Sequence, residues 1–333
     1  MPRLYDGDLF ERVLVAPAEQ GCNDLHIVSG YAAATMASRH MNEVAIRTGI
    51  KLSLSLIVGM TPSEGVTAEN HSGFMALMAG CPWGAFSCSY VMNGRSPVHS
   101  KVYVWTRDGV PEWAFAGSAN YTQRAFFGRQ REVLTECDPA KALHLFNSLD
   151  PETVTCTYGE VEDLVRIQKA PAWSQDEIAE DLPGAISQHG WPKVTCPLVQ
   201  RDGRIHTAGG LNWGQRAGRD PNQAYIPVPA AVSGSDFFPP RGEHFTVLTD
   251  DGKWLICVRA QDDGKAIEIP ADNSQLGEYF RNRLGLANGV FVTREDLERY
   301  GRTDVDFYKT DDGPYLMDFS PPSGRRMRGL LLR

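Results

Sequence analysis

The sequence predicts a chain of two domains, an α/β domain built as a layered sandwich and a mostly β domain after it. The chain has 333 residues, whereas a single domain usually contains about 100–200 residues. Strand-like and helix-like patterns alternate through the first half, as they do in α/β layer sandwiches. In the second half the apolar runs are short and are interrupted by Gly, Pro and Asp-Gly, which is typical of a β barrel or sandwich.

The elements of the first half follow from apolar runs and from the residues that interrupt them. Residues 25–29 (LHIVS) predict a strand, and the alanine-rich stretch 32–46 predicts a helix that ends at Gly49. Residues 51–58 (KLSLSLIV) alternate polar and apolar side chains and predict the next strand. The other elements expected here are strands at 85–91, 101–105, 112–116 and 132–135 and helices at 71–80 and 141–147.

In the second half, Asp-Gly pairs at 251–252 and 263–264 lie between strand candidates, as hairpin turns require. Pro, Gly and Trp interrupt the chain before this half and predict a linker with short helices. We therefore place an α/β domain at 1–165, the linker at 166–195 and a mostly β domain at 196–333. The expected elements of the last domain are strands at 225–228, 245–248, 254–258, 267–269, 290–292 and 305–308 and one helix at 294–299.

The charge is acidic overall but unevenly distributed. The chain has 33 Lys and Arg against 41 Asp and Glu, a net charge of −8, which argues against a uniform nucleic-acid coat and requires a local patch for any DNA binding. Residues 1–165 contain 12 basic and 18 acidic residues, whereas 193–219 contain five basic residues and one acidic residue. Four arginines also lie among the last nine residues, namely Arg325, Arg326, Arg328 and Arg333.

The sequence also argues against membrane and secreted classes. No apolar run approaches the roughly 18 residues of a membrane span, and the start, MPRLYDGDLFERV, lacks the apolar core of a secretory signal. The seven cysteines are scattered and form no CxxC pair, which predicts reduced thiols rather than disulfides or a zinc site. We expect a cytoplasmic protein that does not bind a membrane.

One constellation suits phosphodiester chemistry. His99 and Lys101 lie at alternate positions of a predicted strand, and Ser118 and Asn120 lie at alternate positions near the next one. Residues two apart on a strand share a face, so the four side chains converge if the strands are neighbours. Lys and Asn can bind the oxygens of a phosphate, and an imidazole can attack phosphorus. A carboxylate to orient the imidazole is expected at Glu132, with Glu136 as the alternative.

These residues resemble a known signature. HSKVYVW followed by AFAGSANYT is similar to the HxK…GSxN motif of the phospholipase D superfamily, and IVSGYAA resembles the first strand and turn of its fold. The resemblance implies a phospholipase D-like α/β/α sandwich and a covalent phosphohistidine. Superfamily enzymes use two such motifs, and this chain has one HxK, so the resemblance also implies a homodimer with one composite site and no metal or other cofactor.

Polar stretches of the second half carry candidate DNA contacts. Residues 209–229 and 259–274 supply Arg, Asn and Gln side chains, which recognise base edges, and 279–283 mixes aromatic and basic residues. For a single residue, an ordinary solvated loop is the more frequent explanation. The candidates are Asn212, Trp213, Gln215, Arg216, Arg219, Asn222, Gln261, Asp263, Lys265, Asn273, Ser274 and Arg281.

A second resemblance covers most of the chain. FPPRGEHF, RAQDDGKAIE, NSQLGEYFRNRLGL and LERYGRTDVDFYK resemble the C-terminal region of NgoFVII-type restriction endonucleases. That family joins a phospholipase D-like nuclease to a plant B3-type pseudobarrel that binds DNA. The resemblance implies that double-stranded DNA is the partner, that 212–222 and 261–274 form two arms in the major groove, and that a separate ATPase or helicase-like subunit is a further partner in some relatives.

The sequence therefore predicts a homodimeric, metal-independent restriction endonuclease. The motif alone also permits a phospholipase D-type phosphodiesterase or phosphatidyltransferase that acts on lipid, although no second motif or apolar membrane-facing stretch is visible. A catalytically silent DNA-binding protein is the non-enzymatic alternative, and the complete set of His, Lys and Asn argues against it.

Overall fold

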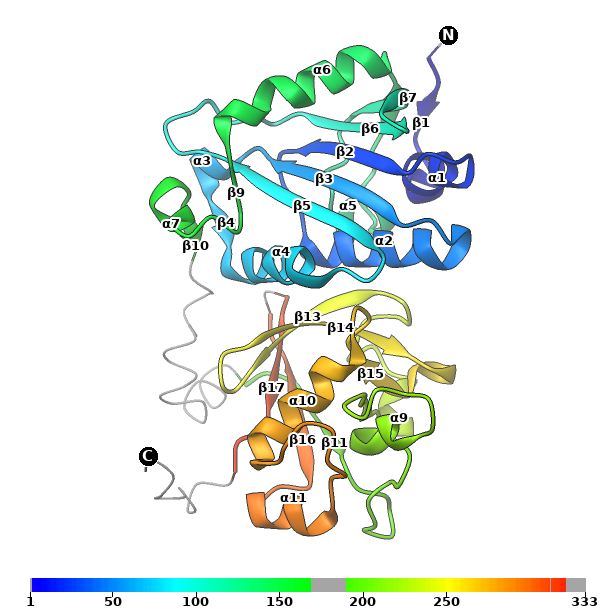
Figure 1. Ribbon diagram of the computed structural model, residues 1–333, viewed down its shortest axis with the longest axis vertical. Coiled ribbons are helices and arrows are strands. Elements are labelled where there is room, and N and C mark those ends of the chain that lie inside the picture. The colour runs from blue at the N-terminus through cyan, green and yellow to red at the C-terminus, as the bar shows by residue number, and fades with distance from the viewer. Residues whose placement is uncertain (1, 169–189, 312, 322–333) are drawn as a thin grey trace. The chain divides into compact units, whose positions relative to one another are not determined.

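The computed structural model describes residues 2–168, 190–311 and 313–321. The chain forms two compact units, Met1–Ala172 and Trp173–Arg333, and each contains one large sheet (Figure 1). Most of the predicted linker, with its expected short helices, and the four C-terminal arginines lie outside the described residues. The described ends of the linker range carry short strands, β10 (Ile167–Gln168) and β11 (Lys193–Pro197).

The first unit is a layered sandwich around an eight-stranded sheet, with strand order β1-β8-β7-β6-β2-β3-β5-β9. Helix α6 packs against β2, β6 and β7 on one face of the sheet, and α2 and α4 cover the other face (Figure 1). The strands are β1 (Leu4–Tyr5), β2 (Asp24–Ser29), β3 (Leu52–Val58), β4 (Val66–Thr67), β5 (Gly84–Val91), β6 (Lys101–Arg107), β7 (Val110–Gly117), β8 (Leu134–Glu136) and β9 (Thr153–Thr155). The helices are η1 (Phe10–Val15), α1 (Ala16–Glu19), α2 (Ala34–Thr48), α3 (Thr61–Glu64), α4 (Ala68–Gly80), α5 (Gln123–Phe127), α6 (Pro139–Leu149), η2 (Asp150–Glu152) and α7 (Val161–Leu164).

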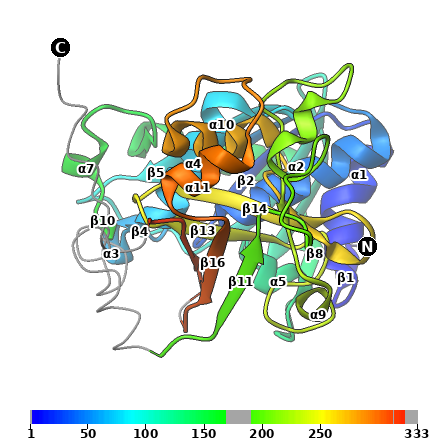
Figure 2. The same ribbon diagram turned by 90° about the horizontal axis from the view of Figure 1, so that it is seen from below.

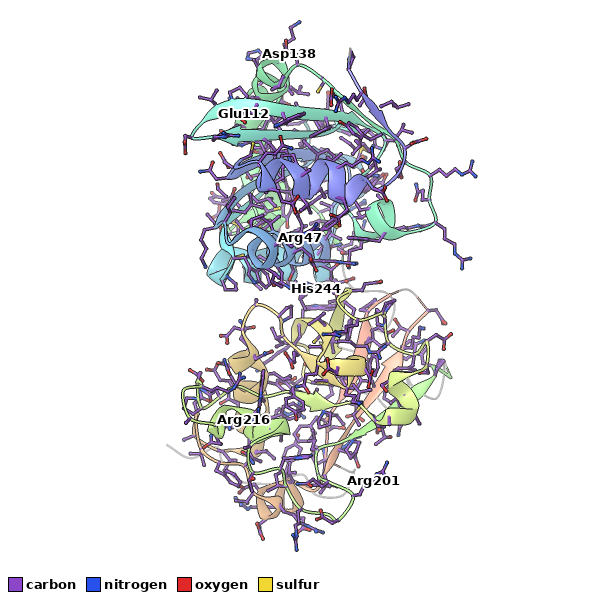
Figure 3. All side chains as sticks on the ribbon, turned by 90° about the vertical axis from the view of Figure 1, so that its right-hand side faces the viewer. Arg47, Glu112, Asp138, Arg201, Arg216 and His244 are labelled. Carbon is purple, nitrogen blue, oxygen red and sulfur yellow. The ribbon has the colours of Figure 1, made fainter. Side chains whose placement is uncertain are left out.

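Local sequence signals account for the ends of these helices. Helix α2 ends as predicted at Gly49, whose φ of +71° lies in the left-handed region that favours glycine. Asp138, labelled in Figure 3, caps α6 by accepting hydrogen bonds from the main-chain nitrogens of Ala140 and Lys141 at 3.0 and 3.1 Å. Among the described residues, no helix is long and apolar enough to cross a membrane.

The second unit is a nearly closed, mostly β barrel. Its seven strands follow the order β11-β16-β17-β13-β14-β15-β12, and the two end strands of this order also contact each other. Strands β13, β14 and β16 can be followed from below in Figure 2. The strands after β11 are β12 (Ile226–Pro227), β13 (His244–Thr249), β14 (Trp254–Ala260), β15 (Ala266–Glu268), β16 (Asp304–Lys309) and β17 (Tyr315–Asp318). The helices are η3 (Gly210–Gln215), α9 (Ala230–Ser233), η4 (Asp262–Gly264), α10 (Asn273–Leu284) and α11 (Arg294–Tyr300).

The barrel confirms the predicted hairpins and corrects two other expectations. Both Asp-Gly pairs lie between antiparallel neighbours, β13 with β14 and β14 with β15. Residues 290–292 are not a strand, because the main chain of Val292 pairs with the side chain of Asn212 instead of with a neighbouring strand. A second helix, α10, was not predicted, although Asp272 caps its start and Gly285 ends it with a φ of +70°.

The cysteines are free thiols, as the sequence predicts. Five of the seven are buried, and Cys81 and Cys137 are half-buried. Burial raises the pKa of Cys257 to about 12, because a thiolate is poorly solvated in an apolar interior. A buried thiol of this kind packs as a small apolar side chain.

Candidate active site

His99 and Lys101 lie together at the start of β6. Strand β6 is flanked by β2 and β7 in the middle of the sheet, and Lys101 pairs with Ser29 of β2. The Nζ atom of Lys101 is 2.9 Å from Nε2 of His99 and donates to the main-chain oxygen of His99 at 2.7 Å. Because an ammonium group can only donate, Nε2 accepts, and the proton of the neutral imidazole is on Nδ1. The predicted juxtaposition of this pair is confirmed.

Lys101 is buried next to the exposed His99. The residue is only 5% exposed, whereas His99 is exposed. Burial lowers the pKa of Lys101 from its ordinary value, and the charge of the Glu132 carboxylate acts in the opposite direction. The ammonium group therefore stays near the imidazole with few water molecules to compete for it, which strengthens any interaction with an entering anion.

Asn120 is brought to the same place from the end of β7. Its Oδ1 atom accepts a hydrogen bond from the main-chain nitrogen of Tyr31 at 3.1 Å. Gly30 lies between the two predicted site residues, since a Cβ atom built there would be 3.0 Å from Cδ2 of His99 and 3.4 Å from Oδ1 of Asn120. The side chains of His99 and Asn120 thus approach the chain at Gly30 more closely than a larger residue would allow. The convergence of these two side chains is confirmed.

Ser118 and Glu132 form a separate part of the site. The Ser118 hydroxyl donates to Oε2 of Glu132 and accepts from the main-chain nitrogen of Val133 at 3.0 Å. Glu132 is 7% exposed and lies two residues before β8 rather than within that strand. In the part of the chain that the structure describes, no hydrogen bond joins Glu132 to His99. The carboxylate acts here on Ser118 directly and on Lys101 through its charge.

Glu136, the alternative carboxylate, has partners elsewhere. It accepts hydrogen bonds from the Tyr5 hydroxyl at 2.6 Å and from the main-chain nitrogen of Arg3 at 3.2 Å. These contacts tie β8 to the edge strand β1 and use both carboxylate oxygens. Of the two candidates, Glu132 is the one that contacts a predicted site residue.

The predicted DNA-contacting residues of the second unit include three that are buried. Asn212 is 0% exposed, and its amide bonds both the nitrogen and the oxygen of Val292 at 2.8 Å. Arg281 is also 0% exposed, and Ser274 is buried in the first turn of α10. The fold of the unit encloses these three side chains in the structure described here, so they are not part of its exposed surface.

Arg281 serves the fold by bracing the first predicted arm. Its guanidinium donates to the main-chain oxygens of Leu211 and Pro221, both at 3.2 Å, and to that of Val290 at 2.8 Å. Leu211 directly precedes the 212–222 stretch and Pro221 lies near its end, so Arg281 of α10 ties both ends of that stretch to the helix. With the oxygens of Gly277 and Asn222, five main-chain carbonyls accept from this guanidinium and account for its full burial.

The other predicted DNA contacts are accessible. In the first arm, the guanidinium of Arg219 lies over the Trp213 ring at 4.1 Å, and Arg216, labelled in Figure 3, donates to the oxygen of Ala208 at 2.7 Å. In the second arm, Lys265 pairs with Asp263 at 2.8 Å. The exposed candidates are Gln215, Arg216, Arg219, Gln261, Asp263 and Lys265, and the half-buried ones are Trp213, Asn222 and Asn273.

Comparison with known protein families assigns both units to one family. The model of the NgoFVII restriction endonuclease N-terminal PLD domain matches residues 7–163, and that of the NgoFVII C-terminal B3-like DNA-binding domain matches residues 186–311. The chain belongs to the NgoFVII restriction endonuclease family. It is a DNA endonuclease with a phospholipase D-like nuclease domain followed by a B3-like DNA-binding domain, and DNA is its partner. The family and the fold class predicted from the sequence are confirmed.

Among solved structures, the nuclease domain of this family member is similar to NucT from Helicobacter pylori, with 18% identity and a TM-score of 0.33 over 46% of this chain and 98% of that chain. It is also similar to Nuc from Salmonella typhimurium, a phospholipase D family member, with 15% identity and a TM-score of 0.33 over the same shares of the two chains. A comparison with curated proteins found no match.

Two features of the site were not found from the sequence. The Tyr31 ring lies beside His99, with ring centroids 6.0 Å apart, whereas the sequence predicts the segment around Gly30 and Tyr31 as a strand and turn without a site residue. The bond between Ser118 and Glu132 joins residues 14 positions apart through an irregular loop, which no periodic pattern marks. Among residues 2–168, 190–311 and 313–321, no group of three or more His, Cys, Asp or Glu side chains is arranged to hold a metal ion.

Proposed function

We propose that this family member is a sequence-specific restriction enzyme that cleaves DNA through a covalent phosphohistidine on His99. The observation that carries the proposal is the contact of 2.9 Å between Nε2 of His99 and Nζ of Lys101, with Asn120 on the other side of Gly30. An unprotonated ring nitrogen next to a buried ammonium group and an amide combines a nucleophile with donors for phosphate oxygens.

The reaction takes two steps that use the same groups. The ammonium group of Lys101 exchanges its hydrogen bond to Nε2 of His99 for one to a non-bridging oxygen of the phosphate. Nε2 then forms a bond to phosphorus, and the bond from phosphorus to the leaving oxygen breaks. The leaving oxygen takes a proton from the imidazolium of a second His99, which acts as general acid. Water then attacks phosphorus and gives its proton to that neutral imidazole, and the phosphorus–nitrogen bond breaks. Lys101 and Asn120 bind the non-bridging oxygens in both steps, and Ser118, fixed by Glu132, assists them.

The second imidazole is proposed to come from another copy of the chain. The sequence contains a single HxK, and an exposed His99 is accessible to a partner. A two-fold axis beside His99 would place two identical imidazoles in one composite site, as a symmetric dimer allows. The proposed unit of activity is therefore a homodimer with one active site.

The proposal includes no metal ion. Lys101 supplies a full positive charge, and Asn120 presents an amide donor because its oxygen is used by Tyr31. Together they supply the charge neutralisation that a divalent cation supplies in other phosphodiesterases. The target sequence is proposed to be read by the exposed side chains of 212–222 and 261–265, with Arg216 and Arg219 as the cations of the first arm.

A plasmid assay tests the proposal. The purified protein is incubated with plasmids of known sequence in EDTA, with and without ATP, and the products are separated on a gel. Discrete fragments in EDTA are expected. Cleavage that requires added Mg²⁺ contradicts the metal-independent mechanism, and a gel shift without cleavage contradicts nuclease activity of the isolated chain. Fragments that form only when a separate ATPase subunit is added with ATP identify that subunit as a required partner.

A further inference from the structure

Tyr31 contacts both the proposed nucleophile, His99, and one of the two proposed phosphate-binding residues, Asn120. It follows β2 in the turn before α2, and its main-chain nitrogen donates to Oδ1 of Asn120 at 3.1 Å. Its ring meets the imidazole of His99 edge to face, with centroids 6.0 Å apart and an interplanar angle of 79°. One residue thus fixes the amide of Asn120 through its backbone and limits the rotation of His99 through its side chain.

The Tyr31 ring is itself anchored. Its hydroxyl donates to Oε1 of Glu64 at 2.5 Å, although the Tyr31 side chain is exposed to water on its outer side, at 37% of its surface. A surface tyrosine would otherwise change its rotamer freely. The side-chain oxygen of Glu64 accepts this hydrogen bond, so Glu64 restrains the Tyr31 ring in its orientation beside His99.

Glu64 is attached to a fixed part of the fold. It is the last residue of α3, and its main-chain nitrogen bonds the oxygen of Met60 at 3.0 Å. Thr61, at the other end of α3, is 1% exposed and donates to the oxygen of Val91 at 2.6 Å. Met60 in turn bonds the oxygen of Gly30 at 3.0 Å. Glu64 and the turn that carries Tyr31 are therefore held together at the carboxyl ends of the neighbouring strands β2 and β3.

We infer that Tyr31 is a positioning residue that holds His99 for attack on phosphorus, and that Glu64 fixes Tyr31 in that orientation. The inference rests on the proposed function, since it concerns the same nucleophile. His99 precedes β6 and is exposed, so neither a strand nor a packed interior restrains its ring. The edge of Tyr31 and the ammonium group of Lys101 define its orientation, and small losses of orientation reduce the rate of a displacement strongly.

Four variants distinguish the contribution of the Tyr31 ring from that of its hydrogen bond to Glu64. Tyr31→Ala removes the ring but keeps the main-chain N–H that binds Asn120, whereas Tyr31→Phe keeps the ring and removes the anchor. Glu64→Ala removes the acceptor, and Glu64→Gln keeps an acceptor oxygen. Tyr158→Phe is the matched control. Tyr158 is 46% exposed, its hydroxyl donates to Oε2 of Glu160 at 3.4 Å, and it is far from β6 in the sequence.

The first readout is steady-state cleavage, which gives kcat and KM. Tyr31→Ala should lower kcat by about tenfold or more and leave KM and target binding unchanged, since misplacement of a reacting group affects the chemical step. Tyr31→Phe and Glu64→Ala should lower kcat by smaller factors. These losses should not add in the double variant, because both substitutions remove the same hydrogen bond. Glu64→Gln and Tyr158→Phe should match the wild type. A kcat for Tyr31→Ala within about twofold of the wild type overturns the inference.

The second readout does not depend on activity. In DNA-free protein with ¹³C-labelled histidines, the ring resonances of His99, assigned with His99→Ala, should move in Tyr31→Ala and stay in place in Tyr158→Phe. Unmoved resonances in Tyr31→Ala overturn the packing on which the inference depends. If the wild type cleaves no DNA, the proposed function fails while this measurement still decides whether Tyr31 orients His99.

Discussion

The hydroxyl of Ser118 donates a hydrogen bond to the carboxylate of Glu132, a residue that is only 7% exposed. A buried carboxylate needs such donors, and the loss of one leaves it with an unsatisfied oxygen. Because the charge of Glu132 also acts on Lys101, this bond connects the irregular loop before β8 to the phosphate-binding side of the site.

We expect Ser118→Ala to reduce both stability and cleavage. Removal of the hydroxyl should lower the free energy of unfolding by about 1–3 kcal/mol, the usual cost of a buried polar group without its partner. Urea unfolding and single-turnover cleavage measure the two effects. Ser87→Ala is the control, since Ser87 is an exposed serine of the same unit whose hydroxyl donates to the Ser55 hydroxyl at 3.1 Å. Equal effects of the two substitutions would show that the bond to Glu132 has no special role.

His99→Ala should abolish cleavage and leave sequence-specific binding intact. The imidazole is the proposed nucleophile, whereas the DNA-binding residues lie in the other unit. Gel-shift titration and plasmid cleavage, both in EDTA, measure binding and reaction separately. His144→Ala is the matched control, because His144 is an exposed histidine of α6 in the same unit. Residual cleavage by His99→Ala at the wild-type rate would remove His99 from the mechanism.

The sequence was sufficient to predict that His99 lies beside Lys101. The two were expected to share one face of a strand, whereas β6 begins at Lys101 and His99 precedes it. Their nitrogens are nevertheless 2.9 Å apart. Tyr31 could not be found in this way. Its contact with His99 depends on β2 and β6 being neighbours, and a single sequence does not specify which strands pair.

The polar residues of the second unit show that residue type alone does not predict whether a side chain is exposed. Asn212 and Arg281 were predicted at a DNA surface because Asn and Arg recognise bases, yet both are enclosed. Composition identifies the functional groups of a side chain but not the direction in which it points. Here the main chains of 211, 221, 290 and 292 lack partners in a sheet, and these two side chains supply them.

Stability should fall as the pH is lowered from about 6.5 to about 4 because of His40. This histidine is fully buried, and burial lowers its pKa to about 4. Its Nε2 donates to the oxygen of Leu14 and its Nδ1 accepts from the Tyr121 hydroxyl, both at 2.8 Å, so the neutral ring is the one that fits. In this pH range the unfolded chain binds a proton that the folded chain does not.

The expected loss approaches about 3 kcal/mol, from the difference between the two pKa values. Urea unfolding at several pH values measures it. His40→Gln should be less stable at neutral pH and should lose part of the pH dependence, whereas the exposed His144→Gln should behave as the wild type. An unchanged pH dependence in His40→Gln would assign the effect to other groups.

Arg281 and Arg219 should respond to substitution in opposite ways. Arg281→Met removes a buried guanidinium and leaves the carbonyls of Leu211, Pro221 and Val290 without donors, so it should lower the free energy of unfolding by about 3 kcal/mol or more. Arg219→Ala removes an exposed side chain that rests on Trp213, and it should change stability by less than about 1 kcal/mol.

DNA binding separates the two arginines further. If Arg219 contacts a phosphate, Arg219→Ala should weaken binding to all sequences and reduce the slope of log K against log salt by about 1. If it contacts a base, discrimination at one position of the target should fall while the slope changes little. Arg281→Met, studied under conditions where it is folded, should retain the wild-type slope, since a guanidinium enclosed by carbonyls neutralises no phosphate. A reduced slope for folded Arg281→Met would show that the first arm opens when it binds DNA.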